Sequence, residues 1–231
     1  MNYPQTPSQL GVRPAAQLST GLVSQALAWM FGGLLITAAV SWIVAGNATL
    51  VTAAENLFLP AIILQLIVVV VLSGGIQKLS ATAALGLFFG YAALTGFTFS
   101  ILFLAYDLGT LTLAFVSASA MFGASAVFGF VTKRDLSAFA RFFMMALIGI
   151  IVVSLLNAFV FQSVGASLLV SYAGVALFAG ITAWDIQRIK NGEIAGLVGS
   201  MEKASVLGAL HLYLDFINMF LFLLRIFGSS R

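Results

Sequence analysis

The chain has 231 residues, of which 61% are hydrophobic and only 7% are charged. A soluble domain carries roughly 25% charged residues, so this composition excludes a water-soluble fold. The ten Lys and Arg residues behind the net charge of +3 are scattered, which excludes the basic surface of a nucleic-acid-binding protein, and the lack of cysteine excludes disulfides and thiol chemistry.

Long apolar runs predict an all-α polytopic membrane protein with seven transmembrane helices. Residues 1–20 are polar and are expected to form a flexible cytoplasmic tail, and residues 21–231 a single transmembrane domain. The first helix is expected to begin after Ser19 or Thr20, both good N-caps. The apolar runs are continuous rather than alternating, which excludes a membrane β-barrel. The predicted spans, of the length needed to cross a bilayer, are 22–45, 57–75, 81–105, 110–131, 139–160, 166–187 and 204–228.

The cations indicate the orientation of these spans. Most of them fall on one side of the predicted map: Arg13, Lys78, Lys133, Arg134, Arg141, Arg188, Lys190 and Lys203. The loops of the other side carry Glu55 and Asp107 instead. The positive-inside rule therefore places the N-terminus in the cytoplasm. Seven full crossings would leave Arg225 and Arg231 outside, so either the last helix crosses against the rule or it is re-entrant.

Small and aromatic residues within the spans are interpreted as structural. Gly86 and Gly90 in the third span are expected to allow close helix packing. Trp29, Trp42 and Trp184 lie near predicted span ends, where an indole ring suits the membrane interface.

Two aspartates stand out because a membrane makes them costly. Asp185 lies at the cytoplasmic end of the sixth span, and Asp215 lies near the middle of the seventh. A lone carboxylate at a helix centre costs about 2.5–3.5 kcal/mol on insertion scales. Asp185 could be an interfacial acid that pairs with Arg188 at i,i+3. Asp215 requires another explanation, because leucine would serve ordinary packing.

The seventh span also carries a polar stripe. Residues at spacings of three and four share one face of this helix: Gly208, His211, Asp215, Asn218, Phe222 and Arg225. Such a stripe should face the bundle interior or a water-filled cavity, which predicts that the last helix is central. His211 is either a packing residue or a proton-coupled partner of Asp215. One His and one Asp are too few ligands for a transition metal.

Several segments resemble the Bax inhibitor family, also called the transmembrane Bax inhibitor motif family. The segments are 132–137, 174–190, 212–218 and 224–228, and the resemblance extends from about residue 20 to the end of the chain. The overall pattern is most similar to the bacterial inner-membrane branch. The resemblance implies a seven-helix fold in which a central C-terminal helix is surrounded by six others. It also implies a pH-sensitive calcium leak whose aspartate pair falls on Asp185 and Asp215.

The chain departs from the family pattern in its second span. The family places an arginine at the cytoplasmic end of this helix, where it latches the aspartate pair. The matching stretch here, 72–79, has no arginine, so Lys78 or Gln77 is the candidate latch. Gln65 occupies a position at which some family members carry an acid. A permeation path through this chain would therefore have fewer fixed negative charges.

The function expected on these grounds is a passive calcium leak gated by a buried aspartate pair. Two close carboxylates in a poorly solvated cavity cannot both ionise easily, so Asp185 and Asp215 would share a proton. Calcium prefers six to eight oxygens, so these carboxylates with Asn218, carbonyls and water would hold it weakly and transiently. His211 and Arg225 are further candidate cavity-lining residues. No cofactor is expected, and calcium is the permeant species.

The main alternative is a non-conducting membrane regulator that binds a membrane protease or a stress or cell-death signalling partner. Enzymatic alternatives are weaker. Leu212, Tyr213 and Leu214 precede Asp215, so the Gly-x-Gly-Asp pattern of intramembrane aspartyl proteases is missing. The string 123–126 with His211 only faintly resembles an intramembrane serine protease, because Gly-Ala-Ser is usual in helix packing. No enzymatic activity is expected.

Overall fold

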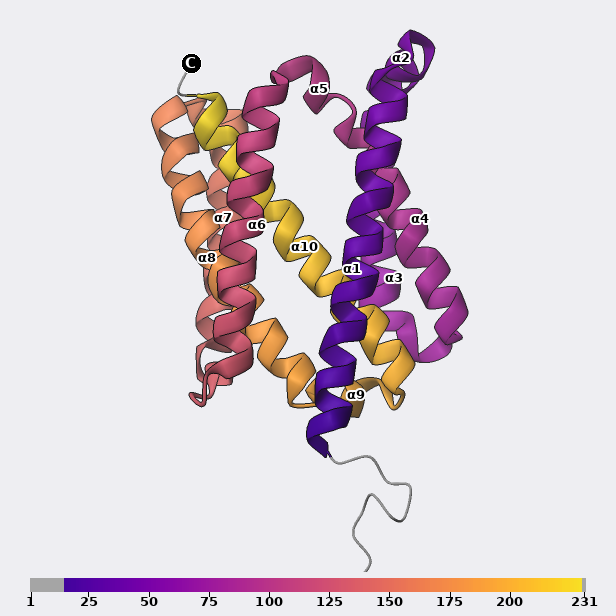
Figure 1. The fold of residues 1–231 in the computed structure, drawn as a ribbon. Coiled ribbons are helices and arrows are strands. Elements are labelled where there is room, and N and C mark those ends of the chain that lie inside the picture. The colour runs from indigo at the N-terminus through magenta and orange to yellow at the C-terminus, as the bar shows by residue number, and fades with distance from the viewer. Residues whose placement is uncertain (1–14, 230–231) are drawn as a thin grey trace, which may run out of the picture.

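Figure 1 shows the computed structural model, which describes residues 15–229 and is mostly helical in that range. The α-helices are α1 (Ala15–Ala45), α2 (Ala48–Asn56), α3 (Phe58–Gly75), α4 (Ala81–Phe99), α5 (Leu102–Ala105), α6 (Leu108–Val131), α7 (Ala140–Leu156), α8 (Val164–Lys190), α9 (Glu193–Val198) and α10 (Met201–Gly228). Three short turns of other helix types join them: η1 (Ile76–Lys78), η2 (Leu136–Phe139) and η3 (Asn157–Phe161). Seven helical stretches in the described residues are long and apolar enough to cross a membrane, which confirms the predicted fold class.

Apart from small shifts at other span ends, the helices differ from the prediction mainly at the N-terminus and in two loops. The first helix begins at Ala15, earlier than predicted, and the rest of the predicted tail, residues 1–14, lies outside the described residues. Two short helices, α2 and α9, occupy segments expected to be loops. The Asn47 side chain caps α2 by accepting hydrogen bonds from the backbone N–H of Thr49 and Leu50.

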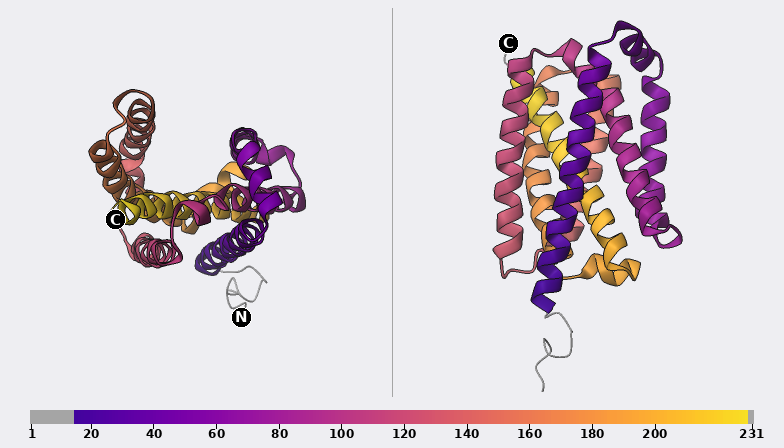
Figure 2. Two further views of the ribbon diagram at one scale, coloured as in Figure 1. Left: turned by 90° about the horizontal axis from the view of Figure 1, so that it is seen from above. Right: turned by 45° about the vertical axis from the view of Figure 1, so that its right-hand side comes forward.

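The C-terminal helix α10 is the centre of the bundle, as predicted. In its most apolar stretch 67% of the residues are buried, against 39% at most in the other six spans. It packs against α1, α4, α6 and α8. Figure 2 shows α10 between these helices when the bundle is seen from above. The remaining spans, α3 and α7, pack mainly on α4 and α8.

The helix α10 runs the full length of the bundle. It has 28 residues and is therefore about 42 Å long. This exceeds the roughly 30 Å of a bilayer's apolar core, so α10 can cross only with a tilt. Figure 1 shows it running diagonally from the end that holds α9 to the end that holds α2 and α5. Of the two alternatives for the last helix, the structure has a continuous helix long and apolar enough for a full crossing, rather than a re-entrant one.

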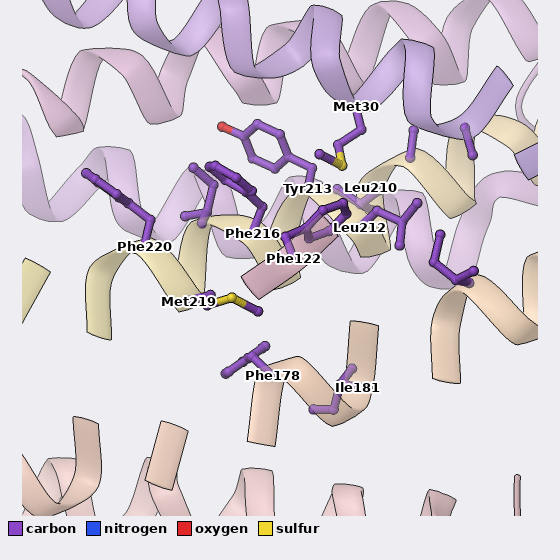
Figure 3. Close-up of a cluster of buried hydrophobic side chains, with 14 of the residues drawn as sticks. Met30, Phe122, Phe178, Ile181, Leu210, Leu212, Tyr213, Phe216, Met219 and Phe220 are labelled. Carbon is purple, nitrogen blue, oxygen red and sulfur yellow. The ribbon is translucent and has the colours of Figure 1, made fainter. Parts of the chain in front are cut away.

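Large side chains of α10 fill the space between the surrounding helices. Figure 3 shows Tyr213 beside Met30 of α1, whereas Met219 lies on the side of Phe178 of α8. The Tyr213 hydroxyl lies 2.6 Å from the Thr37 hydroxyl, so its buried oxygen has a partner. These contacts hold α10 between α1 and α8.

Two glycines permit the closest helix contacts. A Cβ at Gly129 would lie 2.1 Å from the Ala183 carbonyl oxygen, and one at Gly96 would lie 2.6 Å from the Thr37 carbonyl oxygen. These contacts join α6 to α8 and α4 to α1. The expectation that Gly86 and Gly90 pack against a neighbouring helix is wrong. Both are exposed on the outer face of α4, and a Cβ there would meet no atom within 4 Å.

The two ends of the bundle differ in charge. One end holds the start of α1, the α6–α7 connection and α9, together with all described Lys and Arg residues except Arg225. We call it the cation-rich end. The other end, here the opposite end, holds α2, α5 and Arg225.

Candidate functional site

The packing of α8 against α10 buries both aspartates singled out in the sequence. The exposed fraction is 5% for Asp185 and 3% for Asp215. Asp185 lies near the cation-rich end of α8, and Asp215 lies in the middle of α10. Both line one cavity of about 760 Å³.

The wall of this cavity is apolar except for one group of polar side chains. It is built by α7, α8 and α10, with Val69 and Ser73 from α3. The polar and charged side chains that line it are Ser73, Ser154, Trp184, Asp185, Arg188, His211, Asp215 and Asn218. Four of them, His211, Asp215, Asn218 and Asp185, were candidate site residues, so the structure brings these four together.

Asp185 is compensated by cationic groups. The Arg188 guanidinium donates a hydrogen bond of 3.0 Å to its Oδ1. The same guanidinium lies 3.7 Å from Glu193 Oε2 of α9 and 4.6 Å from the centre of the Trp184 ring. Arg188 is therefore fixed on three sides, and it stabilises Asp185 as a carboxylate.

Asp215 has no comparable partner. Its Oδ2 is buried and finds no hydrogen-bond donor among residues 15–229. The nearby Thr182 hydroxyl donates its proton to the Phe178 carbonyl, 2.7 Å away. Asp185 lines the same cavity as Asp215. An ionised Asp215 would thus lie in a cavity with a second carboxylate and with one buried oxygen lacking a donor, which is costly in a buried site.

His211 lies beside Asp185. Its Nδ1 lies 3.8 Å from Asp185 Oδ2, which is too long for a hydrogen bond but close enough for an ion pair when the ring is protonated. Within the described part of the chain this Nδ1 has no hydrogen-bond partner. A proton on His211 would add a second positive charge beside Asp185.

The cavity adjoins two others that lead toward the opposite end. Asn218 and Phe222 also line a cavity of about 540 Å³, which reaches Arg225. Arg225 in turn lines a third cavity of about 350 Å³ at that end. The polar stripe of α10 therefore runs past three neighbouring cavities, and Arg225 lies away from the aspartate pair.

The candidate latch residues lie at the turn between α3 and α4. The Gln77 amide donates to the Leu197 carbonyl at 2.8 Å, and the Lys203 ammonium donates to the Gln77 carbonyl at 3.0 Å. The Lys78 side chain is exposed. These contacts hold the turn against α9 and α10. The cation that pairs with Asp185 is Arg188, not Lys78.

Two side chains close to Asp185 in the sequence have contacts that the sequence did not indicate. Trp184 was placed at the membrane interface, but it lines the cavity and its indole N–H is buried. Gln187 donates to the Arg134 carbonyl and accepts from the Leu136 N–H, both at 2.8 Å, which holds the α6–α7 connection on α8. The only sequence signal for these residues was their position within one turn of Asp185.

No resident metal site is apparent in the part of the chain that the structure describes. It contains no group of three or more His, Cys, Asp and Glu residues that could hold a metal ion. Asp185, Asp215 and Asn218 together supply a few oxygens in one cavity. Such a set can hold a divalent cation only weakly, because calcium prefers six to eight oxygens.

Comparison with known sequences identifies similar proteins over nearly the whole chain. Residues 20–231 match the profile of a family described as inhibitor of apoptosis-promoting Bax1. The chain is 46% identical over 226 residues to the inner membrane protein YbhL of Escherichia coli K12, covering 95% of this chain and 96% of YbhL. It is 48% identical over 210 residues to a protein of Deinococcus radiodurans, covering 90% of each.

Proposed function

Because the chain belongs to the Bax inhibitor family of membrane proteins, we propose that it is a pH-sensitive passive calcium leak gated by Asp185 and Asp215. One observation carries the proposal: two buried carboxylates on adjacent helices line one cavity inside a membrane-spanning bundle. A buried acid in a span is expensive and is usually functional. Two of them in one cavity are better explained by ions or protons than by packing.

The pair can act as a single proton-binding unit. Arg188 pairs with Asp185 at 3.0 Å, and Asp215 lines the same cavity with a buried oxygen that has no donor among the described residues. The two carboxylates therefore share a proton and titrate together. Loss of that proton adds a negative charge between α8 and α10, and repulsion then favours a second arrangement of these helices. This gives a two-state element that pH can bias.

The surrounding charges fit a titration confined to this pair and its neighbours. Helix α8 contributes Arg188, α9 contributes Glu193 beside that arginine, and α10 contributes His211. The cavity-lining residues of α3 and α7 are apolar or carry hydroxyl groups, and none is titratable near neutral pH. A change of pH should therefore act here through the aspartates and His211.

Calcium would cross such a site passively. The two carboxylates and Asn218 attract the ion without enclosing it, so that it can leave again. The cavities that share Asn218 and then Arg225 offer a route toward the opposite end. By the positive-inside rule the cation-rich end would face the cytoplasm, and the resemblance to YbhL favours the inner membrane of a bacterium.

The proposal is tested with purified protein in liposomes loaded with a calcium dye. We expect a passive calcium flux that changes between about pH 6 and 8, where a shared carboxylate proton would be exchanged. Protein-free liposomes give the background leak. Folded protein that gives no flux at any pH would rule out the leak and leave the non-conducting regulator, whose partner would be a membrane protease or a signalling protein.

A further inference from the structure

The cavity of about 760 Å³ that Asp185 and Asp215 line, which we call the aspartate cavity, contains buried polar atoms that the chain itself does not satisfy. Asp215 Oδ2, His211 Nδ1 and the Trp184 indole N–H are buried, and none has a hydrogen-bond partner among residues 15–229. All three side chains line this cavity. Buried polar atoms in native proteins nearly always have a partner. A ligand that enters the cavity can supply the one that is missing.

The charges of the wall leave a place for one cation. Among the described residues that line the cavity, Asp185 and Asp215 are acidic, and Arg188 is the only side chain with a permanent positive charge. Arg188 already pairs with Asp185 at 3.0 Å and also lies 3.7 Å from Glu193. When His211 is neutral, an ionised Asp215 therefore has no counter-charge. Buried charges in proteins are usually paired, and a cationic ligand would pair with this one.

The rest of the wall favours a cation that carries an apolar body. Aromatic rings and aliphatic side chains make up most of it, among them Phe143, Leu147, Ile150, Phe178 and Phe222. The volume of about 760 Å³ lies within the range of small-molecule sites, roughly 300–1,000 Å³. A hydrated metal ion makes no use of this apolar surface. A ligand with one charged end and an apolar body contacts both parts of the site.

The cavity reaches the lipid-facing surface between α3 and α7. At the middle of the bundle, Figure 1 shows α7 on one side of α10 and α3 on the other, and both helices contribute side chains to the wall. Three α7 side chains that line the cavity are also half exposed: Met144 (53%), Ile151 (50%) and Leu155 (54%). Lipid tails are as apolar as these side chains. A ligand with an apolar body can therefore enter from the bilayer.

We propose that the aspartate cavity binds a hydrophobic amine that enters from the bilayer. The ammonium group would donate a hydrogen bond to Asp215 Oδ2 and balance the charge of that carboxylate. The apolar body would lie against the aromatic rings of the wall and extend between α3 and α7 toward the lipid. Because the Asp215 oxygen lacks a donor, the site selects for N–H groups as well as for positive charge.

Binding of the amine does not depend on calcium passage. A bound amine would block the leak by occupying the cavity that both aspartates line, and this consequence alone rests on the proposed function. Binding is measured without a calcium gradient, so the two proposals can fail separately. Amine binding without calcium flux would leave the site without the leak, and flux without amine binding would leave the leak without the site.

The test is equilibrium binding of tritiated phenylbutylamine to the purified full chain in uncharged detergent. We expect saturable binding. Phenylbutanol, which has the same body without the charge, and butylamine, which has the ammonium group without the ring, should each compete about tenfold more weakly or worse. The trimethylammonium derivative keeps the charge but has no N–H donor, and it should also compete more weakly than the primary amine.

Two pairs of variants locate the binding site. Asp215→Asn should weaken binding about tenfold or more, because the ammonium group loses its carboxylate partner. Glu55→Gln is the matched control, since Glu55 is exposed and does not line the cavity, and it should bind like the unmodified protein. Ile151→Trp places a large side chain at the lipid-facing opening and should weaken binding. Ile148→Trp, exposed on the same helix but outside the cavity, should not.

The proposal fails if phenylbutylamine does not bind saturably or if phenylbutanol binds as tightly as the amine. Unchanged affinity in Asp215→Asn would also overturn it. Ile151 is half exposed, so its replacement tests the site even if Asp215→Asn does not fold. Equal binding by Ile151→Trp and Ile148→Trp would then contradict entry between α3 and α7.

Discussion

The surroundings of Asp185 and Asp215 differ mainly in one residue, Arg188. It pairs with Asp185 at 3.0 Å and is itself fixed by Glu193 and Trp184. In the resemblance described above, an arginine on the second span latches the aspartates. Here the arginine beside Asp185 comes from its own helix, one turn away. We therefore expect Arg188 to take over the function of the latch.

Replacing Arg188 should change how tightly the pair holds its proton. Without the guanidinium, Asp185 loses its compensating charge, and the two carboxylates should keep their shared proton to higher pH. We predict that Arg188→Gln moves the midpoint of pH-dependent calcium flux upward by about one pH unit. The measurement is a flux titration in liposomes.

Arg141→Gln is the matched control for this change. It removes the same charge from the same end of the bundle, but Arg141 is exposed and does not line the cavity. Its midpoint should equal that of the unmodified protein. If both variants shift equally, the effect reflects net charge and Arg188 is not a latch.

The two aspartates could be predicted from their chemistry, whereas the side chains around them could not. Asp215 could be singled out because an acid in the middle of an apolar span has a known cost. Trp184 could not, since an indole near a span end has a sufficient explanation at the interface. Only the packing of α7 against α8 shows that this ring lines the cavity.

Among the helices, the pair α6–α8 makes the tightest contact through a glycine. A methyl group at Gly129 would meet backbone atoms of Ala183, two residues before Asp185. Backbone cannot move aside as a side chain can. We predict that Gly129→Ala destabilises the protein by about 1–3 kcal/mol, measured as thermal unfolding in detergent.

Gly123→Ala, on the same helix, is the control. A Cβ there would meet no atom within 4 Å, and alanine is the better helix former. Its unfolding temperature should be unchanged or slightly higher. Equal stability of the two variants would mean that α6 and α8 do not approach as closely as described.

Hydropathy predicted the long helices well and the short ones poorly. The seven spans could be predicted because each is a continuous run of apolar residues. Inside a bilayer, such a run satisfies its backbone hydrogen bonds as a helix. The helices α2 and α9 are too short for that signal, and α9 lies between two glycines in the left-handed conformation, Gly192 (φ 75°) and Gly199 (φ 67°). The sequence also did not show which glycines lie at helix contacts. Gly86 and Gly129 can be distinguished only when the positions of the neighbouring helices are known.

At the scale of the whole molecule, the bundle has two ends with different charge. The side of the membrane that each end faces can be determined with single introduced cysteines, because the chain itself has no cysteine. We predict that cysteines at Lys78, Lys133 and Gly192 label from the cytoplasmic side, and those at Gly46 and Asp107 from the other side. A membrane-impermeant thiol reagent applied to intact and to opened cells makes the measurement. Labelling of positions 107 and 133 from the same side would contradict the arrangement of α6.

If Asp185 and Asp215 gate a leak as one proton-sharing unit, a double-mutant cycle of the pH response should show it most directly. Calcium flux is measured from about pH 6 to 8 for the unmodified protein, Asp185→Asn, Asp215→Asn and the double variant. Asparagine keeps the shape of the side chain but cannot titrate. We predict that either single change flattens the pH dependence and that the second adds little, because coupled groups titrate together. Independent and additive effects of the two changes would contradict the shared proton, even if calcium still crosses the membrane.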